Sequence, residues 1–177
     1  MAKNSIYCYI VEGECEKNLI QSIKNELLLS GSVKVKNIVT ENLSNNFIRL
    51  FRPNTTCILI FDKDVYINKG SAIPQVNRNI ILKNIEKLRK ANNIREVIVI
   101  CQNNNIEDEL IFSTNLKKWE DLFGLKSIKE HKSEFSNCRN LLQKLLKREF
   151  DIKKIWSRKN LEFLPENKSQ KIKIIKK

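Results

Sequence analysis

Short runs of apolar residues alternate along the chain with longer segments in which apolar residues recur every three or four positions. The runs at 6–11, 57–61 and 97–101 are almost continuously apolar, which is typical of strands buried on both faces of a parallel sheet. A fourth segment, 33–39, alternates between apolar and polar residues as a half-exposed strand does. The pattern therefore predicts four strands.

The segments between these runs carry helical periodicity. We expect a first helix from near Glu16 to a stop at Gly31, a short helix over 43–51, and a longer helix after a loop that contains Gly70 and Pro74. The positions expected to be buried are Leu19, Ile20, Ile23, Leu27 and Leu28 in the first helix and Val76, Ile80, Ile81, Ile85 and Leu88 in the longer one.

Strands that alternate with amphipathic helices predict an α/β fold with a mostly parallel, Rossmann-like sheet and helices on both of its faces. Beyond residue 115 one apolar stripe predicts a helix packed on this domain. The stripe consists of Phe135, Cys138, Leu141, Leu142, Leu145 and Leu146. We therefore expect an α/β domain over 1–115 and a basic, mainly helical extension over 116–177, in which 166–177 form a basic strand or a disordered arm.

The positive charge of the chain is concentrated in its last third. Residues 1–115 contain 15 Lys and Arg and 12 Asp and Glu, whereas residues 116–177 contain 18 Lys and Arg and 8 Asp and Glu. The net charge of the whole chain is +13. This excess favours contact with nucleic acid, although a composition rich in Lys, Asn and Ile also produces positive charge without such a role.

No segment indicates export or a membrane span. The run at 6–11 is too short for a signal-peptide core, and no later run approaches the ~18 apolar residues that a membrane helix needs. The five cysteines form no C-x-x-C pair and three of them lie inside apolar runs. We therefore expect a cytoplasmic protein with buried thiols rather than disulfides or a zinc site.

Acidic residues follow the expected carboxyl ends of the three buried strands. Glu12 follows the first, Asp62 and Asp64 follow the second, and Glu107 comes soon after the third. Parallel sheets gather these ends at one edge, where their ligands bind. An Asp-x-Asp pattern places two carboxylates on one side of an extended chain and suits Mg²⁺, but it also occurs in phosphatases, glycosyltransferases and surface turns. Glu12 and Glu107 could instead stabilise helix starts.

Two of these positions lie in longer motifs. The segment from Val11 to Lys17, VEGECEK, and the segment from Phe61 to Asp64, FDKD, resemble the two signatures of the Toprim family. That family includes topoisomerases, bacterial primases, OLD-type and RloB-like nucleases and, more distantly, ribonuclease M5. The resemblance covers roughly residues 5–112 and implies a Toprim-like sheet. The chain has no room for the extra domains of topoisomerases or replicative primases, so a small stand-alone nuclease is favoured.

The resemblance implies a role for each motif residue. Glu12 would act as general acid or base or help to hold metal, and Asp62 and Asp64 would bind Mg²⁺ or Mn²⁺. Gly13 lets the backbone approach a phosphate closely, since it has no Cβ.

A further carboxylate would complete the metal site. By the same resemblance this residue is Glu107, with Asp108 or Glu109 as alternatives. A lysine near the site could offset phosphate charge, and Lys132 or Lys17 is the expected residue.

Basic residues of the extension are expected to hold the nucleic-acid backbone. The candidates are Arg139, Arg158 and Lys159, with Lys17 near the first motif. His131 is the only histidine, which excludes a centre of several histidines, and it is expected to face solvent between charged neighbours. Phosphate-binding and hydrolase motifs such as G-x-x-x-x-G-K-[ST], G-x-G-x-x-G and G-x-S-x-G are absent from the sequence.

These patterns favour a Mg²⁺-dependent nuclease that hydrolyses phosphodiester bonds of DNA or RNA, in phage defence or RNA processing. One alternative is a non-catalytic subunit that binds nucleic acid or an ATPase partner, with Phe135, Trp156 and Phe163 stacking on bases. Another is a hydrolase or phosphotransferase for small phosphate esters.

Overall fold

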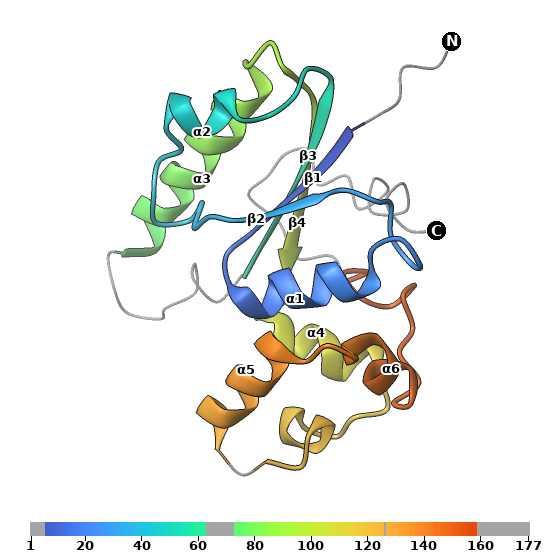
Figure 1. Cartoon of the computed structure of the whole chain (residues 1–177). Coiled ribbons are helices and arrows are strands. Elements are labelled where there is room, and N and C mark those ends of the chain that lie inside the picture. The colour runs from blue at the N-terminus through green and yellow to red at the C-terminus, as the bar shows by residue number, and fades with distance from the viewer. Residues whose placement is uncertain (1–5, 63–72, 126, 159–177) are drawn as a thin grey trace.

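Four strands form one parallel sheet in the order β2-β1-β3-β4 (Figure 1). The protein is described by a computed structural model that covers residues 6–62, 73–125 and 127–158. The predicted α/β fold with a parallel sheet is confirmed. The strands are β1 (Ile6–Val11), β2 (Ser32–Val35), β3 (Thr55–Asp62) and β4 (Ile94–Gln102).

Helices cover both faces of the sheet, which explains why its inner strands β1 and β3 are largely apolar and buried (Figure 1). Along β1, Cys8 and Ile10 pack with the α2 and α3 side, whereas Tyr9 and Val11 pack with α1, α4, α5 and α6. All four side chains are buried. The helices are α1 (Glu14–Ile23), α2 (Asn45–Arg49), α3 (Ile73–Arg89), α4 (Ile106–Ser113), α5 (Ile128–Asn137) and α6 (Leu141–Leu146), with a 3₁₀ turn η2 (Trp119–Leu122).

The strand register brings three strand ends to one edge of the sheet. Val11 of β1 pairs with Ile60 of β3, and the last residue of β3, Asp62, pairs with the last residue of β4, Gln102. Side chains at these ends, and in the loops that leave them, are therefore neighbours although they lie far apart in the sequence.

The first helix is shorter than its periodicity predicts. It ends at Ile23, where the carbonyl oxygen accepts from the backbone N–H groups of Leu27 and Leu28, and Asn25 adopts a left-handed φ of 76°. Asparagine tolerates this conformation better than most residues. The turn still buries Leu28 completely, so the apolar spacing identified a core position but placed it in the wrong element.

The stripe predicted as one C-terminal helix is two helices, α5 and α6, separated at Cys138. The side-chain amide of Asn18 in α1 donates to the carbonyl oxygens of Phe135 (2.6 Å) and Cys138 (3.1 Å), which satisfies groups that the end of α5 leaves without helical partners. Phe135 and Leu141 are fully buried, whereas Leu146 is 45% exposed.

The region beyond residue 115 shares a core with the sheet. One apolar cluster contains Ile98 and Ile100 of β4 together with Phe135 of α5 and Leu141 of α6. The expected packing of a helical extension on the sheet is thus present in the described residues, while the domain boundary at 115 stays a prediction.

Several smaller expectations are also resolved. Ile81, Ile85 and Leu88 are buried in α3, and Pro74 lies in the first turn of that helix rather than before it, where its missing N–H is tolerated. Gly70 and residues 166–177 lie outside the described residues, as does the side chain of Val76.

All five cysteines are free, and four of them are buried. No described helix is long and apolar enough to cross a membrane.

Asn84 of α3 provides a test of the fold away from the sheet edge. Its side chain, 1% exposed, accepts from Leu43 N and donates to the carbonyl oxygens of Ile38 and Glu41, each at 2.8 Å. We expect Asn84→Ala to lower the free energy of unfolding by about 2–4 kcal/mol, because buried backbone groups lose their partners.

Urea denaturation followed by circular dichroism measures this loss. The control is Asn92→Ala at an exposed turn, which should change stability by less than about 0.5 kcal/mol. Equal stability of the two variants would contradict the assigned hydrogen bonds.

Candidate active site

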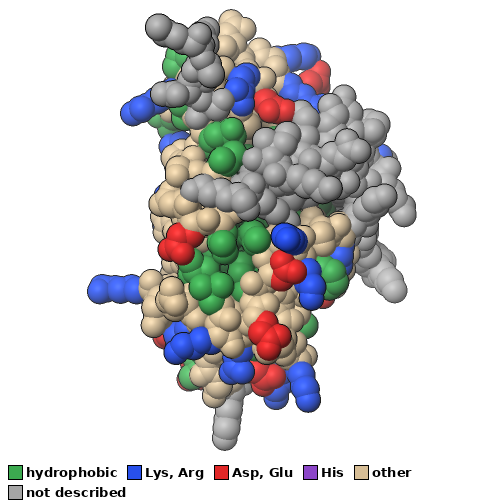
Figure 2. Space-filling model, turned by 90° about the vertical axis from the view of Figure 1, so that its right-hand side faces the viewer, with side chains coloured by type: hydrophobic (Ala, Val, Ile, Leu, Met, Phe, Trp, Pro, Cys, Tyr) green, Lys and Arg blue, Asp and Glu red, His purple; other side chains and the backbone are tan. Residues whose placement is uncertain are grey.

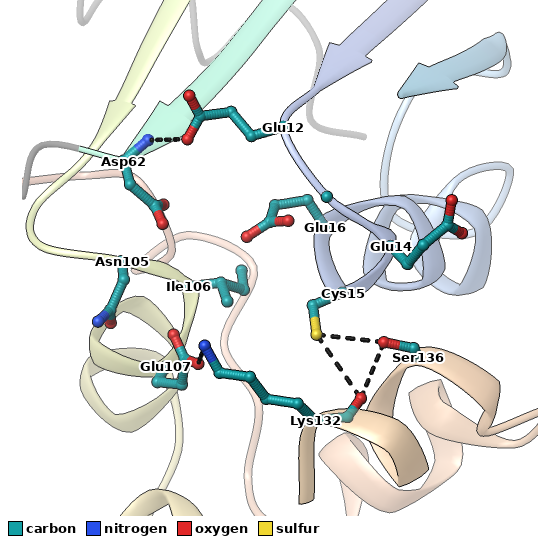
Figure 3. Close-up of a pocket in the computed structure, with 11 residues that line it drawn as sticks. Glu12, Glu14, Cys15, Glu16, Asp62, Asn105, Ile106, Glu107, Lys132 and Ser136 are labelled. Atoms are coloured by element: carbon teal, nitrogen blue, oxygen red, sulfur yellow. Dashed lines mark hydrogen bonds and ion pairs between the residues drawn. The ribbon is translucent and has the colours of Figure 1, made fainter. Parts of the chain in front are cut away.

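A pocket of about 310 Å³ opens at the carboxyl edge of the sheet, between β1 and β3. The chain leaves β1 for β2 on one side and then returns across β1 to β3, so the connections diverge at this point. Ligands of open parallel sheets bind at such a divergence. The pocket is lined by Glu12, Gly13, Glu14, Cys15, Glu16, Asp62, Asn105, Ile106, Glu107, Lys132 and Ser136 (Figure 3).

Glu12 and Asp62, the two motif carboxylates that the structure describes, lie next to each other on one side of this pocket (Figure 3). Oε2 of Glu12 accepts a hydrogen bond from the backbone N–H of Asp62 at 3.2 Å. The end of β3 thereby holds the side chain that follows β1. Asp64 lies outside the described residues, so its metal-binding role stays a prediction.

Gln102, the last residue of β4, holds the Asp62 carboxylate. Its Nε2 donates to Asp62 Oδ1 at 2.5 Å, and its side chain is fully buried. The sequence pattern missed this residue because the predicted strand ended at residue 101, whereas β4 extends to Gln102. The available signal was a glutamine placed directly after a continuous apolar run.

Glu107 faces the pocket from the first turn of α4, opposite Glu12 and Asp62 (Figure 3). It forms an ion pair with Lys132 of α5 at 3.1 Å, and this pairing raises the pKa of Lys132. Of the two lysines considered, Lys132 lines the pocket, whereas Lys17 pairs with Glu14 at 2.8 Å.

The alternatives to Glu107 point away from the pocket. Asp108 and Glu109 both pair with the guanidinium of Arg158, at 2.7 and 3.1 Å. Neither lines the pocket. The geometry therefore favours Glu107 as the third carboxylate.

Glu16 is a pocket residue that the sequence pattern identified only as the start of the first helix. It is 7% exposed, and burial, followed by the charge of Glu107, raises the pKa of its carboxyl group, while hydrogen bonding from Gln102 acts in the opposite direction. A Cβ at Gly13 would lie 3.0 Å from Glu16 Oε2, so the glycine leaves room for this carboxylate.

The pocket carries five carboxyl side chains and one ammonium group, that of Lys132. Carboxylate oxygens are the ligands that Mg²⁺ prefers, so the donor chemistry and the negative charge both fit a hard divalent cation. Among the described residues, however, no three His, Cys, Asp or Glu side chains are grouped closely enough to hold a metal ion. The described carboxylates thus supply part of a metal site, and Asp64 is not among them.

The basic residues predicted to contact nucleic acid lie in different surroundings. Arg139 is exposed at the junction of α5 and α6 and does not line the pocket. Arg158 is engaged by Asp108 and Glu109 and lies over the Phe112 ring, 4.4 Å from its centroid. Lys159 lies outside the described residues. Binding of phosphate by these residues stays a prediction.

The expected solvent-facing position of His131 is wrong, and the alternative in which aromatic side chains stack on bases loses two of its three residues. His131 is fully buried rather than solvent-facing, because its ring packs against Trp119 and Phe123 and its Nε2 lies 2.9 Å from the Glu120 carbonyl oxygen. Phe135 and Trp156 are 0% and 2% exposed, so neither can stack on a base. Phe163 lies outside the described residues.

Comparisons of the chain with protein-family models, curated proteins and solved structures found no match. What the structure defines is an α/β protein with a parallel sheet and an acidic pocket at its carboxyl edge. The likeness to the Toprim family rests on the two sequence motifs.

The raised pKa of Glu16 gives a pH-dependent test of the pocket. A carboxyl whose pKa is higher in the folded state than its ordinary 4.5 stabilises the fold at low pH, and this stability is lost as the pH rises through the folded value. We therefore expect Glu16→Gln, which is neutral at all pH values, to melt at a higher temperature than the wild type at pH 8 in EDTA.

The gain should vanish below about pH 4.5, where the wild-type carboxyl is itself protonated. Scanning calorimetry at both pH values measures the difference, with the exposed Glu134→Gln as control. A wild type as stable as Glu16→Gln at pH 8 would contradict the cost of burying this charge.

Proposed function

We propose that this protein is a Toprim-type nuclease that uses Mg²⁺ or Mn²⁺ to hydrolyse phosphodiester bonds of DNA or RNA. The observation that carries the proposal is the meeting of Glu12 and Asp62, fifty residues apart, through the hydrogen bond from Asp62 N to Glu12 Oε2. They meet at the point of the sheet where such folds bind ligands, and Glu107 faces them across the pocket.

The charge of the pocket supports a metal-dependent reaction. Five carboxyl groups against one ammonium group would repel a phosphodiester unless a cation lies between them. Mg²⁺ bound by Asp62, Asp64 and Glu107 would supply activation of a water molecule and neutralisation of charge on the leaving oxygen. Glu12 is the group proposed to accept the proton of the attacking water or to donate one to the leaving oxygen.

Lys132 is the proposed cationic contact to the substrate phosphate. It projects from α5 to the rim of the pocket, where its side chain is 55% exposed and paired with Glu107. Because the pairing raises its pKa, Lys132 remains charged at neutral pH. An ammonium group on the rim can approach a phosphate from solvent without leaving α5.

The binding surface for nucleic acid is proposed to lie around the pocket on the 116–177 extension. Figure 2 shows one face, on which basic and acidic side chains are interspersed over the lower part of the molecule, where α4, α5 and α6 lie. On this face the positive charge is spread rather than gathered in one patch. A role in phage defence or RNA processing is part of the proposal.

Loss of the best-defined metal ligand tests the proposal directly. We expect the purified protein, with Mg²⁺ or Mn²⁺, to cleave at least one of plasmid DNA, single-stranded DNA, transfer RNA and ribosomal RNA precursor. Asp62→Asn should reduce cleavage by more than about 100-fold, since even outer partners of a metal are worth 10–100-fold. The control Glu86→Gln, on the exposed side of α3, should cleave at the wild-type rate.

The outcomes separate the alternative functions. If all four substrates remain uncleaved with Mg²⁺ and with Mn²⁺, the nuclease proposal is wrong. Nucleic-acid binding that needs no metal and survives Asp62→Asn would favour a non-catalytic subunit. Release of phosphate from free nucleotides, without cleavage of polymers, would favour a small-molecule phosphohydrolase.

Glu12→Gln tests whether Glu12 transfers a proton or binds metal. The amide oxygen of the variant can still accept from Asp62 N, but it cannot take up a proton at neutral pH. We expect cleavage to fall by about 10²–10⁴-fold with little change in Mn²⁺ affinity, measured by isothermal titration calorimetry. Equal losses of cleavage and Mn²⁺ binding would identify Glu12 as a metal ligand instead.

A further inference from the structure

The segment that follows α6 passes behind the pocket and is anchored by a buried carboxylate, Glu109. This side chain is fully buried, and its Oε2 accepts from the backbone N–H of Trp156 at 2.9 Å. Its Oε1 accepts from Asn103 N at 2.8 Å and pairs with Arg158 at 3.1 Å. Glu109 thus ties the end of the described chain to the loop that leaves β4.

Trp156 occupies an unusual position for a large residue. Its φ is 56°, in the left-handed region that side chains with a Cβ rarely adopt, and only 2% of its surface is exposed. Such conformations persist where surrounding contacts hold them, and they often mark a functional constraint. The contacts here are those of Glu109 with the backbone and of Gln102 with the ring.

A chain of hydrogen bonds leads from this ring to the pocket. The indole Nε1–H of Trp156 donates to Oε1 of Gln102 at 3.4 Å, and Nε2 of Gln102 donates to Oδ1 of Asp62 at 2.5 Å. An indole N–H can only donate and a carboxylate can only accept, so the two ends fix which way the amide between them points. The ring of Trp156 therefore determines that Gln102 presents its NH₂ group to Asp62.

We propose that Gln102 and Trp156 are positioning residues for Asp62, with Trp156 acting through the amide of Gln102. The inference rests on the proposed function, because its purpose is to orient a metal-binding carboxylate. The hydrogen bond from Gln102 to Oδ1 restricts the orientation of the Asp62 carboxylate, which lines the pocket. Outer hydrogen-bond partners of this kind orient metal ligands in general. The amide has a second N–H, and Gln102 also hydrogen-bonds the side chain of Glu16.

The hydrogen bonds can be tested without metal or substrate. Trp119 and Trp156 are the two tryptophans of the chain, so their indole N–H resonances can be assigned by replacing each in turn. In EDTA, Gln102→Leu is expected to shift the Trp156 indole resonance and speed its exchange with solvent, while the Trp119 resonance stays in place. An unchanged Trp156 resonance overturns the chain of hydrogen bonds.

The positioning role is tested by Mn²⁺ affinity, measured calorimetrically on variants whose folding is checked by circular dichroism. Gln102→Leu and Trp156→Phe are each expected to weaken Mn²⁺ binding by about 10–100-fold. Trp119→Phe is the matched control, because Trp119 is also buried but its Nε1 has no hydrogen-bond partner among the described residues. It should bind Mn²⁺ as the wild type does.

The double variant separates positioning from general packing. If Trp156 acts through Gln102, adding Trp156→Phe to Gln102→Leu produces no further loss of affinity, whereas independent packing effects would add. Additive losses, or wild-type affinity in Trp156→Phe, overturn the positioning role and leave the proposed function standing. Absence of Mn²⁺ binding in the wild type would overturn the proposed function, and this role with it.

Discussion

Like charges gathered at one edge of the sheet repel one another, and much of the surrounding structure serves to hold them there. Three of the five pocket carboxylates are held by a partner from another element. Glu12 after β1 is held by the backbone of β3, Asp62 of β3 by the amide of Gln102 in β4, and Glu107 of α4 by Lys132 of α5. The parallel register makes the first two of these contacts possible, since it places the carboxyl ends of β1, β3 and β4 beside one another. An acidic pocket of this kind is costly for the folded protein alone and becomes favourable when a cation is present.

The region beyond residue 115 is part of the site rather than only a basic arm. Helix α5 contributes Lys132 and Ser136 to the pocket wall, and the segment after α6 contributes Trp156 and Arg158 to the layer behind it. The sheet domain also stabilises the helical region, because Asn18 of α1 donates hydrogen bonds to the carbonyl groups at the end of α5. Contacts in both directions thus join the described part of the extension to the sheet.

Hydrophobic periodicity predicted the sheet and three of the pocket residues because strand ends in a parallel sheet have a fixed relation to one another. Glu12, Asp62 and Glu107 line the same pocket, as expected. The contribution of Gln102 was missed because hydrogen bonding between strand ends leaves no periodic signal. His131 was placed in solvent because its charged sequence neighbours concealed the aromatic residues that cover it. Similarly, the turn at Asn25 depends on a left-handed backbone that the apolar spacing does not encode.

The contact between Asn18 and the end of α5 also constrains the order in which the molecule is built. The two partners of this contact are separated by about 120 positions in the chain, as are the apolar face of α1 and the α6 side chains that cover it. During synthesis the first βα unit emerges long before Phe135 and Leu141 do. Until then its apolar surface lacks these contacts, so the stability of the first βα unit depends on α5 and α6, which are made much later.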